Sequence, residues 1–265
     1  MKIFAPAILL LMGFNAFAQG AFAQGPNQLA AKINSGEITS VIFDVNGVLL
    51  TRNRIRSITC LGKRAIAGAL LRGERFWSKK NILERLSKVS CKYDGTPLIH
   101  DGLPMPGVMV DWLMGESSSD EILERCRREL KPREILPEIL NLMFSPILLT
   151  YVHDSNPDAI ALLKVLRKKK LSIFVLSNMD MKTAELMKLK FPSIFDPMQG
   201  IMWSAEVHYV KPNPNIYKKF LSEFALIPEK TLFIDDEPLN REAAKLFGIE
   251  VLKETDMLEL AELLA

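Results

Sequence analysis

The residues of this sequence that could do chemistry are carboxylates, amides, a hydroxyl and a lysine, most of them placed directly after apolar segments. They are Asp44, Asn46, Ser177, Asn178, Lys211, Asp235 and Asp236. Carboxylates brought close together repel one another unless a cation lies between them. Oxygen ligands without His or Cys suit Mg²⁺, which usually keeps waters and takes one or two carboxylates. Together with Lys211 and a serine hydroxyl, such a cation would bind a phosphoryl group.

Four short apolar runs, rich in β-branched residues, must position these groups. Continuous runs of this length are typical of strands buried on both faces of a parallel sheet. Three of the runs end directly before Asp44, Ser177 or the pair Asp235-Asp236, so these groups would meet at one sheet edge, where ligands bind. The runs are Ile38–Phe43, Ser172–Leu176, Thr231–Ile234 and Ile249–Leu252.

Amphipathic segments separate the last three predicted strands. Ser155 and Pro157 are a helix start signal, and Gly248 would end another helix as a C-cap glycine. Strands that alternate with helices predict an α/β fold with a doubly wound, Rossmann-like parallel sheet. The predicted helices are Asp158–Lys170, Asn213–Leu226 and Leu239–Phe247.

The stretch between the first two strands is far too long for an ordinary crossover. Its charged segments have helix-like spacing of apolar residues, which predicts an inserted helical cap at residues 57–146 and a core at 19–56 and 147–265. The predicted cap helices are Glu74–Val89, Ser119–Leu130 and Arg133–Phe144.

Residues 1–18 have the pattern of a signal peptide. Lys2 precedes an apolar run, Ile3–Phe17, and Ala16 and Ala18 form the small-residue pattern that signal peptidase accepts. The alternative, an uncleaved anchor, is less favoured because the run is shorter than the roughly 20 residues that span a bilayer. We therefore expect export, with membrane contact only through this segment if it stays uncleaved.

The composition is that of a folded globular protein, with 48% hydrophobic and 25% charged residues. Thirty-four Lys and Arg face 31 Asp and Glu, so the total charge gives no reason to expect a nucleic-acid partner. The spacings of Cys60, Cys91 and Cys126 match no zinc motif. One disulfide with a free thiol and three free thiols both remain open.

Four segments, in order along the chain, resemble the motifs of haloacid dehalogenase-like hydrolases. The position of the insert, between the first and second motif, resembles the helical-cap branch of that family. A single motif would be weak support, but the ordered set spans residues 38–252. The segments are Phe43–Leu49, Leu176–Asn178, Lys211–Tyr217 and Phe233–Asn240.

The resemblance implies a Mg²⁺-dependent hydrolase in which Asp44 attacks phosphorus of a small phosphorylated substrate and forms an aspartyl-phosphate. Ser177 would hydrogen-bond a phosphoryl oxygen, and Lys211 would hold Asp44 and neutralise growing negative charge. The side chain of Asp44, the backbone carbonyl of Asn46 and the carboxylate of Asp236 would ligate the metal. Asp235 would be a second ligand or hold a metal-bound water. Asn46, Gly47, Asn178 and Arg54 are the residues expected to bind substrate.

Asn46 departs from the family pattern, because phosphatases of this family usually have a second aspartate there as general acid and base. An amide can serve in neither role, and such catalysis is typically worth 10²–10⁴-fold. A phosphatase with reduced turnover is therefore the leading interpretation. A secreted binding protein for a phosphorylated ligand is the alternative. A dehalogenase is weaker, since metal-independent dehalogenases lack a metal-binding pair such as Asp235-Asp236.

Arginines alternate just after the first motif, at positions 52, 54 and 56. We hypothesise that one or two of them, Arg54 in particular, face the substrate and select an anionic tail. All three would lie on one side only if the segment is extended, and a solvated hairpin edge is the alternative. His208 is expected on a surface loop, and Trp77 and Trp112 in the core of the cap.

Overall fold

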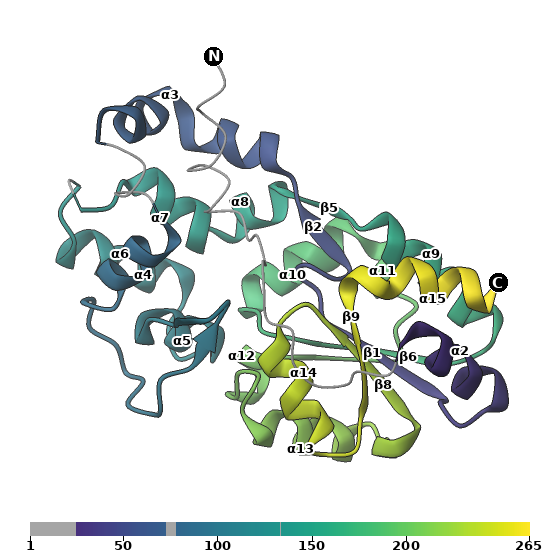
Figure 1. Ribbon diagram of the computed structural model, residues 1–265. Helices are drawn as coiled ribbons and strands as arrows, with labels where there is room; N and C mark the ends of the chain where they lie inside the picture. The colour runs from purple at the N-terminus through teal and green to yellow at the C-terminus, as the bar shows by residue number, and fades with distance from the viewer. Residues whose placement is uncertain (1–24, 73–77, 133) are drawn as a thin grey trace.

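The protein is described by a computed structural model that covers residues 25–72, 78–132 and 134–265. At its centre lies a five-stranded parallel sheet with strand order β7-β6-β1-β8-β9. The predicted doubly wound, Rossmann-like α/β fold is confirmed (Figure 1). In this spatial order, the strands are β7 (Gly200–Trp203), β6 (Ser172–Ser177), β1 (Ser40–Phe43), β8 (Thr231–Asp235) and β9 (Glu250–Lys253).

The central strand β1 explains why these sequences form a sheet with two covered faces. All four of its residues are buried, and successive side chains point to opposite faces. Val41 and Phe43 belong to one hydrophobic cluster and Ile42 to another, one on each side of the sheet. Burial on both faces therefore selects the continuous apolar run seen in the sequence.

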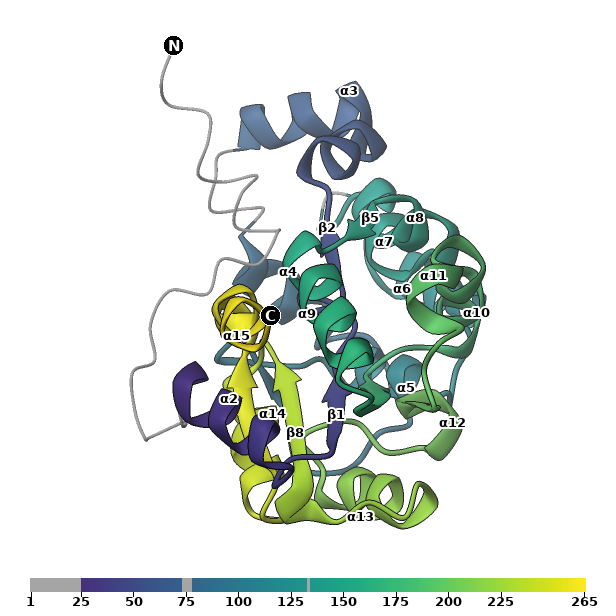
Figure 2. The same cartoon turned by 90° about the vertical axis from the view of Figure 1, so that its right-hand side faces the viewer.

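Helices cover both faces of the sheet (Figures 1 and 2). The first face is covered by α2 (Pro26–Ser35), α9 (Pro157–Lys168) and α15 (Met257–Leu264), whose apolar side chains share a cluster with β1. The second face is covered by α13 (Pro214–Glu223) and α14 (Pro238–Lys245). The three helices predicted for the core, α9, α13 and α14, are all present within a few residues of their expected ends.

Several elements escape the sequence analysis. The edge strand β7 contains Gly200, Met202 and Trp203, and Ile201 is its only β-branched residue, so it lacks the pattern of the other strands. Short elements complete the core and the link to the cap. They are α8 (Pro146–Tyr151), α10 (Met181–Lys190), α11 (Pro192–Phe195), α12 (Ser204–Val207), η2 (Pro228–Lys230) and η3 (Glu254–Asp256).

A helical insertion lies beside the carboxyl edge of the sheet, on the left of Figure 1. The chain enters it through β2 (Leu50–Arg52) and returns through β5 (His153–Ser155), and these two strands pair antiparallel. The insertion has a hydrophobic cluster of its own, which includes Val108, Ile122 and Phe144. Its elements are α3 (Arg54–Arg72), α4 (Lys79–Leu86), β3 (Ile99–His100), β4 (Leu103–Pro104), α5 (Gly107–Leu113), α6 (Ser119–Glu129) and α7 (Pro137–Phe144).

The helices α4, α6 and α7 lie within the three segments predicted as cap helices. The division into a core at residues 19–56 and 147–265 and a cap at 57–146 stays a prediction. The predicted signal segment, residues 1–18, lies outside the described residues, as does Trp77. Among the residues that the structure describes, no helix combines the length and hydropathy needed to cross a membrane.

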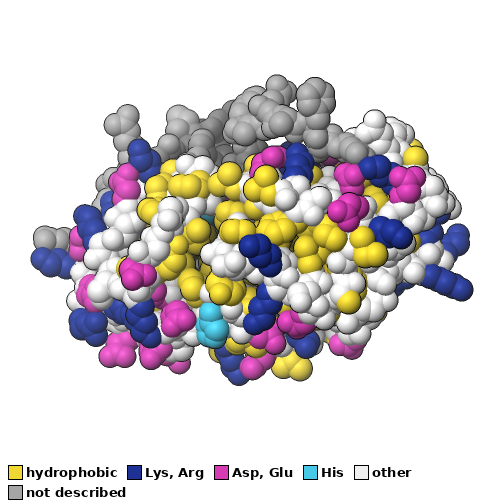
Figure 3. Space-filling model, turned by 90° about the horizontal axis from the view of Figure 1, so that it is seen from below, with side chains coloured by type: hydrophobic (Ala, Val, Ile, Leu, Met, Phe, Trp, Pro, Cys, Tyr) yellow, Lys and Arg dark blue, Asp and Glu magenta, His cyan; other side chains and the backbone are white. Residues whose placement is uncertain are grey.

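On the face seen in Figure 3, Lys and Arg are interspersed with Asp and Glu around a middle region of hydrophobic side chains. That face therefore has no continuous basic surface. Cys60 is half-buried, Cys91 exposed and Cys126 buried, and all three are free thiols. Of the two alternatives left open by the sequence, the structure has three free thiols.

Candidate active site

The ammonium group of Lys211 joins the ends of three strands. Its Nζ lies 2.9 Å from Asp44 Oδ1, directly after β1, and 2.6 Å from Asp235 Oδ2 at the end of β8. It also donates to the carbonyl oxygen of Leu176 in β6, at 2.9 Å. Because Lys211 is only 2% exposed, this cation is held in place by two carboxylates and a backbone dipole rather than by water.

The charges in this cluster depend on one another. Burial alone would lower the pKa of Lys211, but the adjacent carboxylates of Asp235 and Asp44 raise it above its ordinary value. The lysine is therefore charged at neutral pH. Removing the lysine would leave two buried carboxylates without a compensating charge, which is strongly destabilising.

The loop that carries Lys211 is fixed by Asn178. The amide nitrogen of Asn178 donates to the Lys211 carbonyl at 3.0 Å, and the Lys211 N–H donates to its amide oxygen at 2.8 Å. Asn178 lines the cavity, but both ends of its amide already contact the loop backbone. Its role in this geometry is to position Lys211, and direct substrate binding by Asn178 stays a prediction.

Asp235 and Asp236 differ in what they offer a metal ion. Asp235 is fully buried, and its oxygens accept from Lys211, from the backbone N–H of Glu237 at 2.8 Å and from the amide of Asn240 at 3.0 Å. The carboxylate of Asp236 accepts no hydrogen bond from the residues that the structure describes. The carboxylate of Asp236 is therefore more available to a metal ion, whereas Asp235 is held in place by its hydrogen bonds.

The three acidic side chains fit a divalent cation. Ligand oxygens of Asp44, Asp235 and Asp236 lie within 4.8 Å of one another. Burial, followed by repulsion from Asp44 and Asp235, raises the pKa of Asp236 to about 8, and burial also raises that of Asp235. A cation would relieve both effects, and a donor set made only of oxygen suits Mg²⁺.

Gly47 makes room for one of these ligands. A Cβ built on Gly47 would lie 2.4 Å from Asp236 Oδ2, and the residue has a φ of +85°. A side chain at this position would collide with the carboxylate and strain the backbone. The glycine is therefore required by the close approach of Asp236. It contributes space here, and a direct contact with substrate stays a prediction.

The turn between Asp44 and β2 is held by its own backbone. The Gly47 N–H donates to the Leu50 carbonyl at 2.8 Å, and the Leu50 N–H to the Val45 carbonyl at 2.9 Å. The side chain of Asn46 is exposed and lines the cavity above Asp44. At the position where phosphatases that resemble this chain usually have an acid–base aspartate, the amide of Asn46 thus faces the cavity.

Ser177 carries a hydroxyl without a hydrogen-bond partner in the part of the chain that the structure describes. Its Oγ is buried and makes no hydrogen bond with the described residues, although the residue stands at the end of β6 beside the carbonyl that Lys211 contacts. Ser177 is not among the residues that line the cavity. A hydrogen bond from this hydroxyl to a phosphoryl oxygen stays a prediction.

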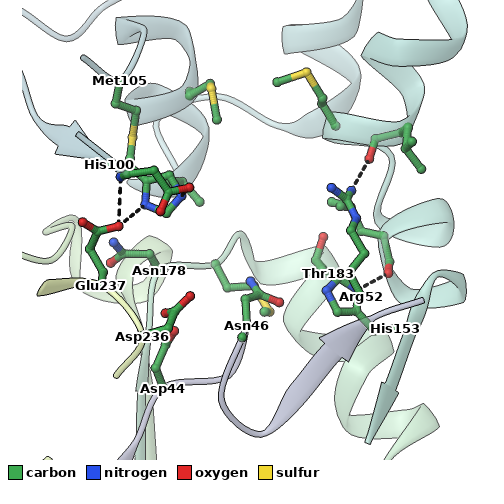
Figure 4. A pocket seen from close by; sticks show the side chains of 18 of the residues that line it. Asp44, Asn46, Arg52, His100, Met105, His153, Asn178, Thr183, Asp236 and Glu237 are labelled. Atoms are coloured by element: carbon green, nitrogen blue, oxygen red, sulfur yellow. Dashed lines mark hydrogen bonds and ion pairs between the residues drawn. The ribbon is translucent and has the colours of Figure 1, made fainter. Parts of the chain in front are cut away.

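Above the acidic cluster, a cavity of about 560 Å³ lies between the core and the helical insertion (Figure 4). Asp44, Asn46 and Asp236 form its floor. The opposite wall comes from the insertion and is largely apolar. Its apolar residues include Met105, Met109, Trp112, Leu142 and Met143.

One part of that wall is polar and reaches the core. His100 and Asp101, at the turn between β3 and β4, contact Glu237, which follows the acidic pair in the sequence. His100 Nδ1 lies 3.1 Å from Glu237 Oε2, and the same oxygen accepts the Asp101 N–H at 2.9 Å. The ammonium of Lys79 pairs with the Asp101 carboxylate.

The three arginines after the first motif do not share one extended segment. The strand β2 ends at Arg52 and the helix α3 begins at Arg54, so the condition for a common side is not met. Arg52 and Arg54 line the cavity, whereas Arg56 pairs with Asp154 and donates to the Tyr151 carbonyl at 2.7 Å. Arg56 is thus committed to holding the base of the insertion.

Arg52 lies with His153 and Thr183 on one side of the cavity (Figure 4). Its guanidinium donates to the Leu142 carbonyl at 3.1 Å, while its Nε and the Thr183 hydroxyl are buried without a partner among the described residues. Burial lowers the pKa of Arg52 and brings that of His153 down to about 4, so His153 is neutral.

Two further predictions concern the insertion. His208 is exposed, as expected, and its Nδ1 lies 2.8 Å from the Met114 carbonyl, outside the residues that line the cavity. Trp112 is buried in the cluster of the insertion and also lines the cavity.

Sequence reasoning missed His100, Asp101, Glu237, Lys79, His153 and Thr183 as cavity residues. Glu237 lies inside the fourth motif, so the sequence shows that it is close to Asp235. Nothing in the sequence assigns Glu237 a role, however. His100 and Asp101 lie in an irregular stretch, where no periodicity predicts which side chains face the core. Only the scarcity of histidine, with three in the chain, sets His100 apart in the sequence.

Comparison with known proteins finds one matching family model and several similar solved structures. A family model for haloacid dehalogenase-like hydrolases matches residues 38–248. A solved structure of a HAD family enzyme from Bacteroides thetaiotaomicron, in complex with magnesium and inorganic phosphate, has a TM-score of 0.54 and 18% identity. The match covers 82% of this chain and 93% of the chain of that enzyme.

Two other solved structures are similar. One, described as a predicted HAD-like family hydrolase from Porphyromonas gingivalis, has a TM-score of 0.52 and 23% identity, covering 82% of this chain and 91% of its own. The other, L-2-haloacid dehalogenase from Xanthobacter autotrophicus, has a TM-score of 0.50 and 19% identity. The match covers 81% of this chain and 76% of the dehalogenase chain. At these identities the likeness establishes the fold.

Proposed function

The chain belongs to the haloacid dehalogenase-like hydrolases, and on that premise we propose that it is a Mg²⁺-dependent phosphomonoester hydrolase that acts through an aspartyl-phosphate on Asp44. The observation that carries this proposal is the contact of one buried ammonium group, Lys211 Nζ, with both Asp44 and Asp235. It places a fixed positive charge beside a carboxylate that faces the cavity. The similar enzyme in complex with magnesium and phosphate supports the same ligands here.

In this mechanism the Asp44 carboxylate attacks phosphorus and the ester oxygen leaves with its bonding electrons. Lys211 holds Oδ1 of Asp44, which directs the other oxygen toward the cavity, and its charge stabilises the transition state. The Ser177 hydroxyl donates to a phosphoryl oxygen. Water then hydrolyses the acyl phosphate and frees Asp44.

Asp44, Asp236 and the backbone carbonyl of Asn46 would hold the Mg²⁺ ion, with Asp235 behind them. The bound ion supplies charge neutralisation to the phosphoryl group. Asp236 is the direct ligand in this proposal because its carboxylate is not engaged by the described protein groups, whereas both oxygens of Asp235 are.

The cavity suits a small phosphorylated substrate with an apolar portion. Methionines and Trp112 face the floor from the insertion, and methionine adapts to irregular ligand shapes. Arg52 and Arg54 add positive charge to the wall, which supports selection of a second anionic group at the far end of the substrate.

Asn46 is the reason to expect slow turnover of esters with poor leaving groups. If wild-type protein bound Mg²⁺ and phosphate analogues without turnover, the alternative of a binding protein would be favoured. A dehalogenase would instead release halide from a 2-haloacid. The carboxylate of Asp236, which is available to a metal ion, makes that reaction the weaker candidate, because metal-independent dehalogenases lack such a metal-binding pair.

The test uses purified protein that begins near Gln19. Phosphate release is measured from p-nitrophenyl phosphate and a panel of phosphomonoesters, with Mg²⁺ or EDTA, alongside Asp44→Asn; halide release from a 2-haloacid is measured in parallel. We expect phosphate release that requires both Mg²⁺ and Asp44. Phosphate release that persists in Asp44→Asn would overturn the assignment of the nucleophile.

We also propose that the chain is exported and that residues 1–18 are removed. The support is the sequence pattern around Ala16 and Ala18. Mass spectrometry of protein recovered from outside the cytoplasm tests this: an intact N-terminus on the exported protein would contradict cleavage.

A further inference from the structure

The polar hairpin of the insertion puts an imidazole into the catalytic cavity. His100 lines this cavity together with Asp44, Asn46 and Asp236, and its side chain is 46% exposed (Figure 4). One ring nitrogen, Nδ1, faces the Glu237 carboxylate at 3.1 Å. A carboxylate at one nitrogen fixes the ring orientation and leaves the other nitrogen for proton exchange.

Glu237 is itself fixed to the catalytic floor. Its side chain is 6% exposed, and its backbone N–H donates to Asp235 Oδ1 at 2.8 Å. Its carboxylate accepts the backbone N–H of Asp101 at 2.9 Å as well as facing His100. The orientation of His100 is therefore set by a residue two positions from Asp235, not only by the hairpin.

The cavity needs a proton donor because Asn46 cannot supply one. Two of the described cavity residues are histidines, His100 and His153. His153 is buried, Nδ1 contacts the Leu149 carbonyl at 2.6 Å, and burial holds its pKa near 4. It lies with Arg52 on the other side of the cavity (Figure 4), so His100 is the better-placed imidazole.

We propose that His100, oriented by Glu237, carries out the proton transfers that Asn46 cannot. This inference rests on the proposed phosphatase function. In the first half-reaction the Asp44–phosphorus bond forms, the phosphorus–ester oxygen bond breaks, and His100 Nε2 gives its proton to the departing oxygen. In the second, water attacks phosphorus, its proton passes to Nε2, and phosphate leaves with Asp44 restored. Protons and electrons balance over the two steps.

A metal site is the other reading of this cluster, because donor atoms of His100, Asp101 and Glu237 lie within 4.8 Å of one another. The carboxylates, however, already have partners. Lys79 pairs with Asp101, and the Asp101 N–H with Glu237. An ammonium in contact with one of the three ligands disfavours a second cation, so we assign the cluster to proton transfer.

Carboxylates of Glu237 and Asp101 face His100, and Lys79 contacts one of them, Asp101. Glu237 precedes α14, Asp101 belongs to the hairpin itself with its Oδ2 3.7 Å from His100 Nε2, and Lys79 begins α4. The ring of His100 therefore lies between two carboxylates, one of which holds the ammonium of Lys79.

The test compares two esters with His100→Gln, a variant of similar size that cannot exchange a proton. For an alkyl phosphate, whose leaving oxygen needs a proton, kcat/KM should fall roughly 10²–10⁴-fold. For p-nitrophenyl phosphate, which leaves as a stable anion, kcat/KM should change less than about threefold. The alkaline limb of the kcat/KM profile for the alkyl ester should also disappear, because the donor must be protonated in the first half-reaction. Asn46→Asp in the His100→Gln background should restore alkyl-ester hydrolysis.

His208→Asn is the matched control, because His208 also contacts the insertion from the core but does not line the cavity. It should leave both esters unaffected. Equal losses for both esters in His100→Gln would make the histidine a structural contact and overturn the proposal, as would no loss for either. Wild-type turnover of neither ester would instead refute the phosphatase function, and this proposal with it. Turnover that is unchanged in Asp44→Asn would refute only the assigned nucleophile.

Discussion

The two sides of the cavity are built on different principles. The floor, formed by Asp44, Asn46 and Asp236, rests on a network of buried charges in which Lys211 contacts both Asp44 and Asp235. The opposite wall is largely apolar, with methionines and Trp112 from the insertion, and the polar hairpin and two arginines interrupt it. Buried charges have few acceptable arrangements, whereas flexible apolar side chains have many. The floor is therefore suited to one chemistry, and the wall to the choice of substrate.

The sharpest way to break this comparison is to remove the floor's cation. Lys211→Met leaves the buried carboxylates of Asp44 and Asp235 without a compensating cation, which should cost about 3–5 kcal/mol of unfolding free energy and abolish turnover. Denaturant unfolding measures the loss. Met109→Leu, a change of similar volume on the wall, should cost less than about 1.5 kcal/mol. Equal losses at both sites would remove the distinction between floor and wall.

The floor should also respond to pH when no metal is bound. Because the folded protein holds a proton on Asp236 up to a pKa of about 8, against an ordinary 3.8, it binds more protons than the unfolded chain between those values. The free energy of unfolding in EDTA should therefore fall as pH rises from about 4 to 8, by at most about 6 kcal/mol, since one pKa unit corresponds to about 1.4 kcal/mol.

Saturating Mg²⁺ should flatten this dependence, because the cation replaces the proton between the carboxylates. Asp236→Asn should flatten it in EDTA as well. Thermal unfolding across this pH range, with and without Mg²⁺, provides the measurement. An Asp236→Asn variant with the slope of wild-type protein would show that another group titrates.

A smaller effect should follow from filling the space beside Asp236. In Gly47→Ala the added methyl would meet Asp236 Oδ2, so the ligand must move and Mg²⁺ affinity should fall roughly 10–100-fold. Gly25→Ala is a control, since no atom lies within 4 Å of a Cβ there. Isothermal titration of Mg²⁺ into both variants measures the difference, and unchanged affinity in Gly47→Ala would place the metal away from Asp236.

The smallest effect is expected on the wall. Arg54→Ala should raise KM by roughly three- to tenfold for substrates with a second anionic group and leave kcat unchanged, since an exposed charge contributes little. Steady-state kinetics on esters with and without a carboxylate tests this. An equal KM change for both kinds of ester would mean that Arg54 does not select an anionic tail.

The same contrast governs what could be read from the sequence. Asp44, Ser177 and Asp235 were placed together correctly because each ends a continuous buried run, and such runs follow from burial on both faces. The strand β7 was missed because its composition is atypical. The contact of His100 with Glu237 joins residues far apart in the chain through an irregular hairpin, and no local pattern encodes it.

Side-chain roles were harder to predict than positions. Asn178 was expected at the substrate, yet its amide contacts the Lys211 backbone at both ends. The arginines after the first motif were separated because α3 begins at Arg54, a helix start that the sequence analysis did not place. In both cases the outcome depends on which backbone groups lie nearby, which only the folded chain determines.

The central claim is that Asp44 becomes phosphorylated during turnover, and acid quenching tests it most directly. Protein mixed with a phosphomonoester and Mg²⁺ is quenched within the first turnover, digested at low pH and examined by mass spectrometry for a phosphorylated peptide that contains Asp44. We predict that this peptide appears in wild-type protein and is absent from Asp44→Asn. Phosphate release without a phosphorylated Asp44, or equal release by Asp44→Asn, would contradict the account.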